Sequence, residues 1–369
     1  MSVTIKDIAQ SLNISEATVS RSLRNDPVIN PATRARVHHA AISIGYQGPS
    51  RRPRMRRDQA AGAAKPAPTT VRPVDNGIAV LLGVPDASHA RTHGNVVRLL
   101  QGITAECDAV GFRQSLHIIA PIGSEPDTAT AARMKSILEG GGLAGLIVEG
   151  LVPDIAIKLA SEQFPVVTIA RRYDDLPADA LVSDNMFAFC HLVETLADLG
   201  HERFVFVDDD RLDTFVDERY AGFVIGCGRK GISLANQRRL GPASYIAFGP
   251  EVHIASEAMD ELLAPPHPTA YVCVNDRAAW RLLAACRQRG LEAPRDISVA
   301  GFDNDAITFD DGVRKDRVLT TIDPSYVETG RYAVRLLNQR IAQPSTPYLR
   351  VSIPYRFIEG ETIGPAPTH

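Results

Sequence analysis

The apolar residues near the N-terminus follow the spacing of short amphipathic helices. From position 5 to position 12 they recur at i, i+3, i+4 and i+7, as Ile5, Ile8, Ala9 and Leu12. Ser15 is placed to cap a second helix that ends near Leu23, and Asn30 with Pro31 can begin a third. The pattern predicts three short helices around a small core, which by itself is equally typical of any small three-helix bundle.

From position 77 onward, apolar strands alternate with amphipathic helices. The expected strands cover residues 78–84, 115–119, 143–148, 166–169, 204–207, 271–274, 297–300 and 348–357. The expected helices cover residues 96–110, 131–138, 189–199 and 279–289. Such alternation predicts parallel sheets covered by helices on both faces. These units are too many for one sheet, so we expect two doubly wound lobes with a ligand cleft at the carboxyl ends of their strands.

Composition places the chain among soluble globular proteins. Of its 369 residues, 44% are hydrophobic and 22% are charged. No apolar run is long enough to cross a bilayer, and the first residues lack the basic and apolar regions of a secretion signal. We therefore expect a cytoplasmic protein that does not use a membrane.

The five cysteines are scattered through apolar segments, without a C-x-x-C pair or a histidine at metal-ligand spacing. This distribution predicts free buried thiols, no metal site and no cofactor. The charges are more informative, because residues 1–74 hold twelve Lys and Arg against four Asp and Glu. That segment carries +8, and the remainder carries −11 of the net −3. A cationic end on an acidic body suits a polyanionic partner.

Three segments of the N-terminal region carry a motif. They read Val3-Thr-Ile-Lys-Asp-Ile-Ala9, Ile14-Ser-Glu-Ala-Thr-Val-Ser-Arg21 and Gly45-Tyr46, with Thr33, Arg34 and Val37 between the last two. Together they resemble the DNA-binding headpiece of the LacI/GalR family almost position for position. The resemblance implies an all-α helix-turn-helix whose second helix lies in the major groove of double-stranded DNA.

This resemblance assigns DNA contacts to residues of the second helix and its surroundings. Glu16, Ala17 and Arg21 would meet base edges, since glutamate accepts from cytosine, a methyl group contacts thymine and arginine binds guanine bidentately. The residues at family positions that hold phosphates are Thr4, Ser15, Thr18, Ser20, Thr33 and Arg34. Solvation alone is the alternative for Glu16 and Arg21, and helix capping alone is the alternative for Ser15.

Residues 47–75 join a basic cluster to a stretch rich in Ala, Pro and Thr that cannot form a core. In the family, a short hinge helix here inserts a side chain into the minor groove, and Met55 stands at that position. Pro53 lies inside this expected helix. The alternative is therefore an arm that follows the phosphate backbone through Arg51, Arg52, Arg54, Arg56 and Arg57.

The α/β region carries further motifs. They are Gly200-His201, Arg219 with Gly222-Phe223, Asn275-Asp276, Asp296-Ile-Ser-Val-Ala-Gly-Phe-Asp303 and Leu319-Thr-Thr-Ile322. They resemble the periplasmic-binding-protein-like domain of the same family. The resemblance implies that Arg219 and Asp276 hydrogen-bond effector hydroxyls, although Asp276 could instead cap the helix after its strand. The full set of expected effector contacts is Asn95, Arg171, Asp184, Arg219, Asn275, Asp276 and Asp303.

Residues 85–98 depart from the family, which has paired aromatic residues after the first strand. This chain places polar groups there, among them His89, Arg91, His93 and Asn95. Arg171 follows another strand end at the expected cleft. These residues favour an effector more polar than a plain hexose, such as a sugar acid or a phosphorylated sugar. Arginines that merely lie at the surface are the alternative.

The sequence thus predicts a headpiece with its hinge at 1–57, a linker at 58–75, a bilobed effector-binding and dimerisation domain at 76–360, and a tail at 361–369. The expected protein is a homodimeric transcriptional regulator of repressor type, controlled by a small sugar or sugar-like effector. Its DNA partner would be a near-palindromic operator with half-sites ~34 Å apart. No heptad helix follows the last expected strand, which argues against a coiled-coil tetramer.

Two other classes of protein compete with this interpretation. A solute-binding protein without gene regulation would need only the second region. An enzyme is not expected, because no catalytic motif occurs with supporting context. Whether an effector releases or promotes DNA binding is left open by the sequence.

Overall fold

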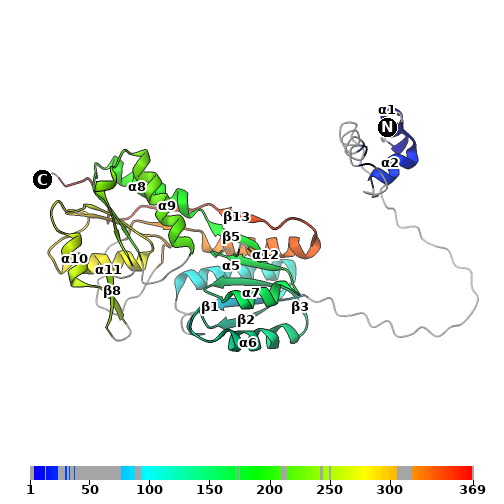
Figure 1. The fold of residues 1–369 in the computed structure, drawn as a ribbon, viewed down its shortest axis with the longest axis horizontal. Helices are drawn as coiled ribbons and strands as arrows, with labels where there is room; N and C mark the ends of the chain where they lie inside the picture. The colour runs from blue at the N-terminus through cyan, green and yellow to red at the C-terminus, as the bar shows by residue number, and fades with distance from the viewer. Residues whose placement is uncertain are drawn as a thin grey trace, which may run out of the picture. The chain divides into compact units, whose positions relative to one another are not determined.

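The computed structural model describes residues 4–12, 14–23, 30, 33, 37, 76–87, 93–171, 173, 175–208, 214–241, 244–248, 251–305 and 318–367. The chain divides into two units, residues 1–70 and residues 71–369, which are drawn in Figure 1. Across the described residues, no helix is long and apolar enough to pass through a membrane.

Two helices form the described part of the first unit. Helix α1 spans Ile5–Leu12 and α2 spans Glu16–Leu23, as the apolar spacing predicts. The backbone N–H of Ile14 donates to the carbonyl of Ala9 at 3.1 Å and closes the turn between the helices. The buried residues that pack together are Ala9, Val19 and Val37. Of the expected third helix, the described residues include Asn30, Thr33 and Val37.

The first lobe of the second unit is a six-stranded parallel sheet in the order β13-β5-β4-β3-β1-β2. Its strands are β1 (Gly77–Gly83), β2 (Arg113–Ile119), β3 (Leu143–Gly150), β4 (Val166–Ile169), β5 (Asp179–Ser183) and β13 (Arg350–Ile353). Its helices are α5 (Gly94–Val110), α6 (Asp127–Glu139), α7 (Asp154–Ser161) and α12 (Tyr326–Ala342).

Helices cover both faces of this first sheet (Figure 1). Ile78, Val80 and Leu82 of β1 pack with residues of α5 and α12. Ala79 and Leu81, which point the other way, pack with residues of α6 and α7. The unbroken apolar run of β1 is therefore buried on both sides, as expected for a parallel strand.

The second lobe is a four-stranded parallel sheet in the order β11-β10-β6-β7. Its strands are β6 (Phe204–Val207), β7 (Gln237–Leu240), β10 (Ala270–Cys273) and β11 (Ser298–Ala300). Its helices are α8 (Asn185–Asp198), α9 (Thr214–Arg229), α10 (Ser256–Leu262) and α11 (Asp276–Arg287), with the short η1 (Leu234–Asn236). An antiparallel pair, β8 (Tyr245–Phe248) and β9 (Glu251–Ile254), was not expected from the sequence.

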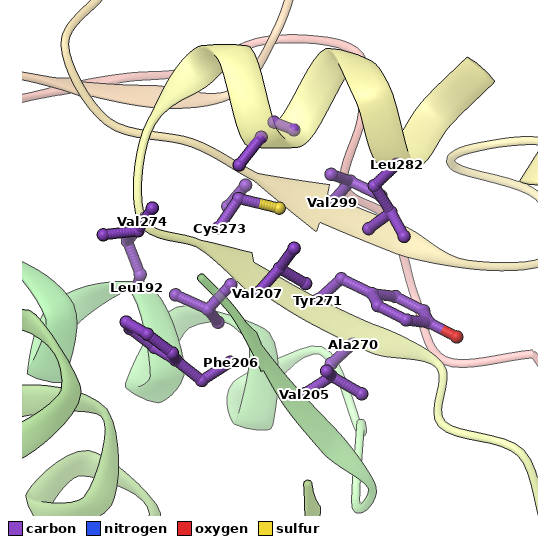
Figure 2. Packing of buried hydrophobic residues seen from close by; sticks show 14 of the residues in the cluster. Leu192, Val205, Phe206, Val207, Ala270, Tyr271, Cys273, Val274, Leu282 and Val299 are labelled. Atoms are coloured by element: carbon purple, nitrogen blue, oxygen red, sulfur yellow. The ribbon is translucent and has the colours of Figure 1, made fainter. Parts of the chain in front are cut away.

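Figure 2 shows the interior of the second lobe, where Tyr271 and Val299 from neighbouring strands lie beside Leu282 of α11, while Phe206 lies beside Leu192 of α8 on the other face of the sheet. The pairing of α8 with α9 depends on a glycine. A Cβ added at Gly222 would lie 2.3 Å from the carbonyl oxygen of Met186 on α8. The glycine of the Gly222-Phe223 motif therefore allows the two helix backbones to approach, while Phe223 enters the core.

The chain crosses between the lobes three times. It passes from β5 to α8 through Asp184, from β12 (Thr321–Asp323) to α12 through Pro324 and Ser325, and from β13 to β14 (Arg356–Ile358) through Pro354 and Tyr355. Strands β12 and β14 pair with each other in antiparallel register. The two lobes of the expected fold are confirmed, and their connections lie at the ends of the strands.

The structure corrects the last expected strand. Residues 348–357 do not form one strand, because β13 ends at Ile353 and β14 begins at Arg356. Pro354 cannot donate a ladder hydrogen bond, and the chain changes lobes at this point. Beyond β14, the hydroxyl of Thr362 donates to Val299 and the N–H of Ala366 to Leu199, so residues set apart as a tail lie against the second lobe.

All five cysteines are free and buried, as expected.

Candidate nucleic-acid and effector sites

Helix α2 presents the expected base-reading residues on its outer face. Glu16, Ala17 and Arg21 are exposed, whereas Val19 is fully buried against the small core. The side chain of Ser15 accepts a hydrogen bond from the backbone N–H of Thr18 at 3.1 Å, so Ser15 caps the helix. The capping role expected for Ser15 is confirmed, and a phosphate contact by Ser15 stays a prediction.

The expected phosphate-binding residues differ in their exposure. Thr4 is exposed, while Thr18, Ser20 and Thr33 are half-buried. The hydroxyl of Thr18 also lies 2.8 Å from that of Ser15. Arg34 and Met55 lie outside the described residues, as do Pro53 and the neighbouring arginines of the basic cluster, so the hinge and arm hypotheses stay predictions.

The expected effector residues lie at the carboxyl ends of strands and at a crossover. Arg171 follows β4, Asp184 joins β5 to α8, and Asp303 follows β11. Asn275 and Asp276 follow β10, Arg219 is on α9, and Asn95 is in the first turn of α5. These are the positions where doubly wound sheets bind ligands.

Arg219 is the most constrained of these residues. Its side chain is 7% exposed, and the guanidinium carbon stands 3.7 Å from the centre of the Phe302 ring. Its Nε donates to Asn185 Oδ1 at 2.9 Å, and its Nη1 donates to the carbonyl oxygen of Val274 at 2.6 Å. Its Nη2 lies 4.0 Å from Asp303 Oδ1. These contacts fix the plane of the guanidinium beside the Asp303 carboxylate.

Asp276 places a buried carboxylate next to this pair. Its Oδ1 accepts a hydrogen bond from the Thr321 hydroxyl at 2.6 Å, and its Oδ2 accepts from the backbone N–H of Asp305 at 2.8 Å. Burial, followed by the nearby charge of Asp303, raises the pKa of Asp276 well above its usual value.

The alternative role of Asp276 as a helix cap is wrong. Asn275 is the N-cap of α11, and its Oδ1 accepts from the backbone N–H of Ala278 at 2.8 Å. The two side chains therefore have different roles. The Asn275 amide caps α11, and the Asp276 carboxyl group accepts hydrogen bonds from Thr321 and Asp305.

Asp303 is held in an unusual backbone conformation, with φ at 112°. Its Oδ1 accepts from the hydroxyl of Tyr326 at 2.7 Å, and its carbonyl oxygen accepts from Arg98 Nη2 at 2.7 Å. Burial raises the pKa of Asp303, against the opposing effect of the Arg219 charge. Arg98 and Tyr326 were not singled out in the sequence, because their partners lie far along the chain.

The remaining expected residues have partners of their own. Arg171 Nη2 lies 3.4 Å from Asp154 Oδ1, and its guanidinium carbon stands 4.9 Å from the centre of the Tyr173 ring. The backbone N–H of Val96 donates to Asn95 Oδ1 at 2.8 Å. Asp184 is half-buried, and burial raises its pKa. The structure thus joins Arg219, Asp276 and Asp303 in one charged network and places the other residues on neighbouring connections. His89 and Arg91 lie outside the described residues.

No group of three or more His, Cys, Asp or Glu that could hold a metal ion occurs in the described parts of the chain.

Comparison with known proteins covers both units. Residues 4–48 match the bacterial regulatory proteins of the lacI family, and residues 193–363 match the periplasmic binding protein-like domain. The chain is 27% identical over 376 residues to the HTH-type transcriptional regulator reg1 of Streptomyces lividans, which covers 98% of this chain and 97% of that protein. The chain therefore carries the helix-turn-helix domain and the periplasmic binding protein-like domain of LacI-type regulators.

Solved structures agree with these domain matches at the level of fold. The lac repressor dimer bound to operator and the anti-inducer ONPF superposes with a TM-score of 0.61 at 19% identity, over 98% of this chain and 99% of that one. The transcriptional regulator CelR in complex with cellobiose gives a TM-score of 0.62 at 19% identity, over 98% and 99% of the two chains. Because residues 4–48 match the lacI family and the relatives are HTH-type transcriptional regulators, this protein is a DNA-binding transcriptional regulator and not an enzyme.

Proposed function

We propose that this LacI-type regulator is a homodimeric repressor that binds a near-palindromic operator through α2 and responds to a small sugar-like effector held by Arg219, Asp276 and Asp303. The observation that carries the effector half is the fixed guanidinium of Arg219 beside the half-buried carboxylate of Asp303, whose charge in turn acts on the buried carboxyl group of Asp276. The similarity to the lac repressor dimer on its operator supports the repressor and dimer assignments.

The exposed face of α2 supports the DNA half of the proposal. Arg21 lies one turn beyond Glu16 and Ala17, so all three can reach successive base edges in a major groove. Thr4 before α1, and Ser15 and Thr18 near the start of α2, would hold phosphates, with Ser20, Thr33 and Arg34. Because its target is genomic DNA, the protein would act in the cytoplasm.

The proposed domains follow one another along the chain, with the DNA-binding part first and the effector-binding part after it. A headpiece with a hinge or basic arm occupies residues 1–57, a linker occupies 58–75, and the effector-binding and dimerisation domain begins at 76. Met55, or the arginines beside it, would add contacts to the minor groove or to phosphates.

The sequence favours a sugar acid or a phosphorylated sugar, whereas the contacts made by the arginines at the site support a neutral polyol instead. Arg98, Arg171 and Arg219 already donate to or pair with protein acceptors. The carboxyl oxygens of Asp276 and Asp303 are suited to accept from ligand hydroxyls, and Arg219 can donate to a vicinal oxygen. Asn95, Arg171, Asp184 and Asn275 would complete the contacts from the neighbouring connections. The cellobiose bound by CelR is such a neutral polyol.

Selection from a random DNA library tests the DNA half. The full-length protein should enrich a near-palindromic sequence, and an Arg21→Ala variant should lose it. Arg295→Ala, at an exposed arginine on the second lobe, is the matched control and should enrich the wild-type motif. Failure of the wild-type protein to enrich any sequence, with and without a sugar panel, would contradict the proposal.

A thermal-shift panel tests the effector half. Ribose, glucose and cellobiose are compared with ribose 5-phosphate, glucose 6-phosphate and glucuronate. A neutral sugar should raise the Tm of the wild-type protein and of an Arg133→Met control, and should fail to raise that of Arg219→Met or Asp303→Asn. Stabilisation by the acidic compounds alone would overturn the preference for a neutral effector.

A further inference from the structure

The first turns of α5 reach from the first lobe to the second. Helix α5 belongs to the first lobe, where Leu99 and Ile103 enter its core. On the same helix, Arg98 Nη2 donates at 2.7 Å to the carbonyl oxygen of Asp303, which follows β11 of the second lobe. Arg98 Nη1 lies 4.0 Å from Asp323 Oδ1, at the end of β12. Arg98 therefore contacts both the loop of residues 303–305, which holds the proposed effector ligand Asp303, and the crossover that begins after Asp323.

The acceptors that meet Arg98 are themselves fixed. The direction of the Asp303 carbonyl follows from its φ of 112°, from its N–H donating to Ile322, and from its carboxylate accepting from Tyr326. The side chain of Asp323 is 5% exposed and accepts from the N–H of Ser325 at 2.7 Å and from Arg356 Nη2 at 2.7 Å. Arg98 thus binds a rigid pair of acceptors.

A second contact joins α5 to the 303–305 loop, and here the charged group belongs to the loop and is acidic. The carboxylate of Asp305 lies against the first turn of α5, since a Cβ added at Gly94 would stand 2.3 Å from Asp305 Oδ1. A negative charge at a helix N-terminus is favourable. The N–H of Asp305 donates to Asp276 Oδ2 at 2.8 Å. The 303–305 loop therefore places the acidic Asp305 against the N-terminus of α5, and the same turns of α5 place the cationic Arg98 against the carbonyl oxygen of Asp303.

We propose that Arg98, with Asp305 against Gly94, forms an inter-lobe latch that holds the lobes in the described arrangement and sets how strongly effector binding is coupled to DNA binding. This inference rests on the proposed function for its second half only. Asp276 and Asp303 are the proposed effector ligands. Asp303 belongs to the loop that the latch holds, and Asp276 accepts a hydrogen bond from the backbone N–H of Asp305 in the same loop. An effector that moves the loop must then loosen or tighten the latch, which is how one site biases the other.

If Arg98 served only to stabilise the fold, its removal would lower the stability of the protein and leave the arrangement of the lobes unchanged, whereas the latch predicts the reverse. The side chain of Arg98 is 25% exposed, and each lobe has a core of its own. Removal of the guanidinium should therefore leave both lobes folded and change only their relative arrangement. Arg98→Met keeps most of the apolar stem and loses both contacts, while Arg98→Lys keeps the charge and loses the fork.

The distance between the lobes is the direct readout. Spin labels at Lys135→Cys on the first lobe and Leu234→Cys on the second use residues whose exposed fractions are 73% and 79%. The native cysteines are buried and would remain unlabelled. Labelled protein is mixed with excess unlabelled protein, so that pulsed electron resonance reports distances within one subunit.

The expected result is one dominant distance for the wild type and for the Arg133→Met control, whose arginine stays within the first lobe. Arg98→Met should shift the balance between lobe arrangements roughly ten-fold, the effect of losing one charge-assisted hydrogen bond, and Arg98→Lys should shift it less. An unchanged distance distribution in Arg98→Met would overturn the latch, whatever the protein binds.

The coupling half is measured with the DNA selected from the library as the probe. Arg98→Met should change the Kd for that DNA several-fold in one direction, with the selected sequence unchanged. A shifted lobe distance with an unchanged Kd would overturn the coupling while leaving the latch in place. Absence of any selected DNA for the wild type would instead count against the proposed function, and the distance experiment would still decide the latch.

Discussion

Arg340 of α12 and Asp179 of β5 form a buried bidentate ion pair. Nε donates to Oδ2 and Nη2 to Oδ1, each at 2.7 Å, and the two side chains are 4% and 0% exposed. Arg340 also donates to the carbonyl of Pro347 at 2.8 Å, and Asp179 accepts from the N–H of Leu349 at 2.7 Å. The pair therefore fastens the chain that leads into β13 to the strand beside it.

Breaking this pair should be costly, because it leaves one buried charge without its partner. Arg340→Met should lower the free energy of unfolding by about 3–5 kcal/mol, measured by urea denaturation. Arg331→Met removes an exposed ion pair on the same helix and should change it by less than about 1 kcal/mol. Arg340→Met combined with Asp179→Leu should recover part of the loss. No recovery would show that the unpaired carboxylate is not the source of the cost.

Substitutions at Ser15 should separate capping from DNA contact. Ser15→Asp keeps an N-cap acceptor and adds a charge that favours the helix N-terminus, whereas Ser15→Ala removes the cap at a cost of about 1 kcal/mol. Ser15→Asp should therefore not lower the melting temperature of the N-terminal unit. If Ser15 also holds a phosphate, Ser15→Asp should weaken operator binding by repulsion. Operator binding equal to the wild type in Ser15→Asp would leave capping as its only role.

The buried His201 should make the second lobe sensitive to acid. Its ring nitrogens lie 2.9 Å from the hydroxyls of Thr269 and Ser298, and burial lowers its pKa. The folded state therefore holds the neutral ring more strongly than the unfolded state does, so stability is lost as the pH falls below ~6.5, the usual pKa of histidine. His201→Gln should flatten the decline in unfolding free energy from pH 7 to pH 5.

His191→Gln, at an exposed histidine, is the control for this measurement and should keep the wild-type slope. Equal slopes in the wild type and His201→Gln would assign the acid sensitivity to other groups.

Asp276 should act in the opposite sense. Its raised pKa means that the folded state binds this proton more tightly than the unfolded state, so its contribution to stability falls as the pH rises above ~4, the usual range of aspartate. Asp276→Asn cannot ionise and should lose less stability than the wild type between pH 5 and pH 8. Urea denaturation across that range measures the difference, and a steeper decline in Asp276→Asn would contradict the assignment.

Local patterns were enough for much of the fold. The 3–4 spacing of α1, the cap at Ser15 and the apolar run of β1 each depend on neighbours within a few residues, and each appears as predicted. The motifs that contain Asp276 and Asp303 could be placed after strands for the same reason, and the motif that contains Arg219 could be placed on a helix.

Packing decided what the local patterns could not. Local spacing allows either Asn275 or Asp276 to cap α11. Asp276 instead binds Thr321, which lies 45 residues away, and Asn275 is the cap. The break between β13 and β14 depends on where the chain changes lobes, although Pro354 marks the place.

The sequence by itself determined the class of this protein: a helix-turn-helix unit followed by two doubly wound lobes, with the residues that can bind DNA and an effector. Only the tertiary structure decided which charges meet. Arg98 and Asp303 are 205 residues apart, and Arg340 and Asp179 are 161 apart. Helix and strand periods act over a few residues and fix which face a side chain takes. The choice of a distant partner requires the chain to be folded, because burial of the cores brings the elements together and only then gives each charge its neighbour.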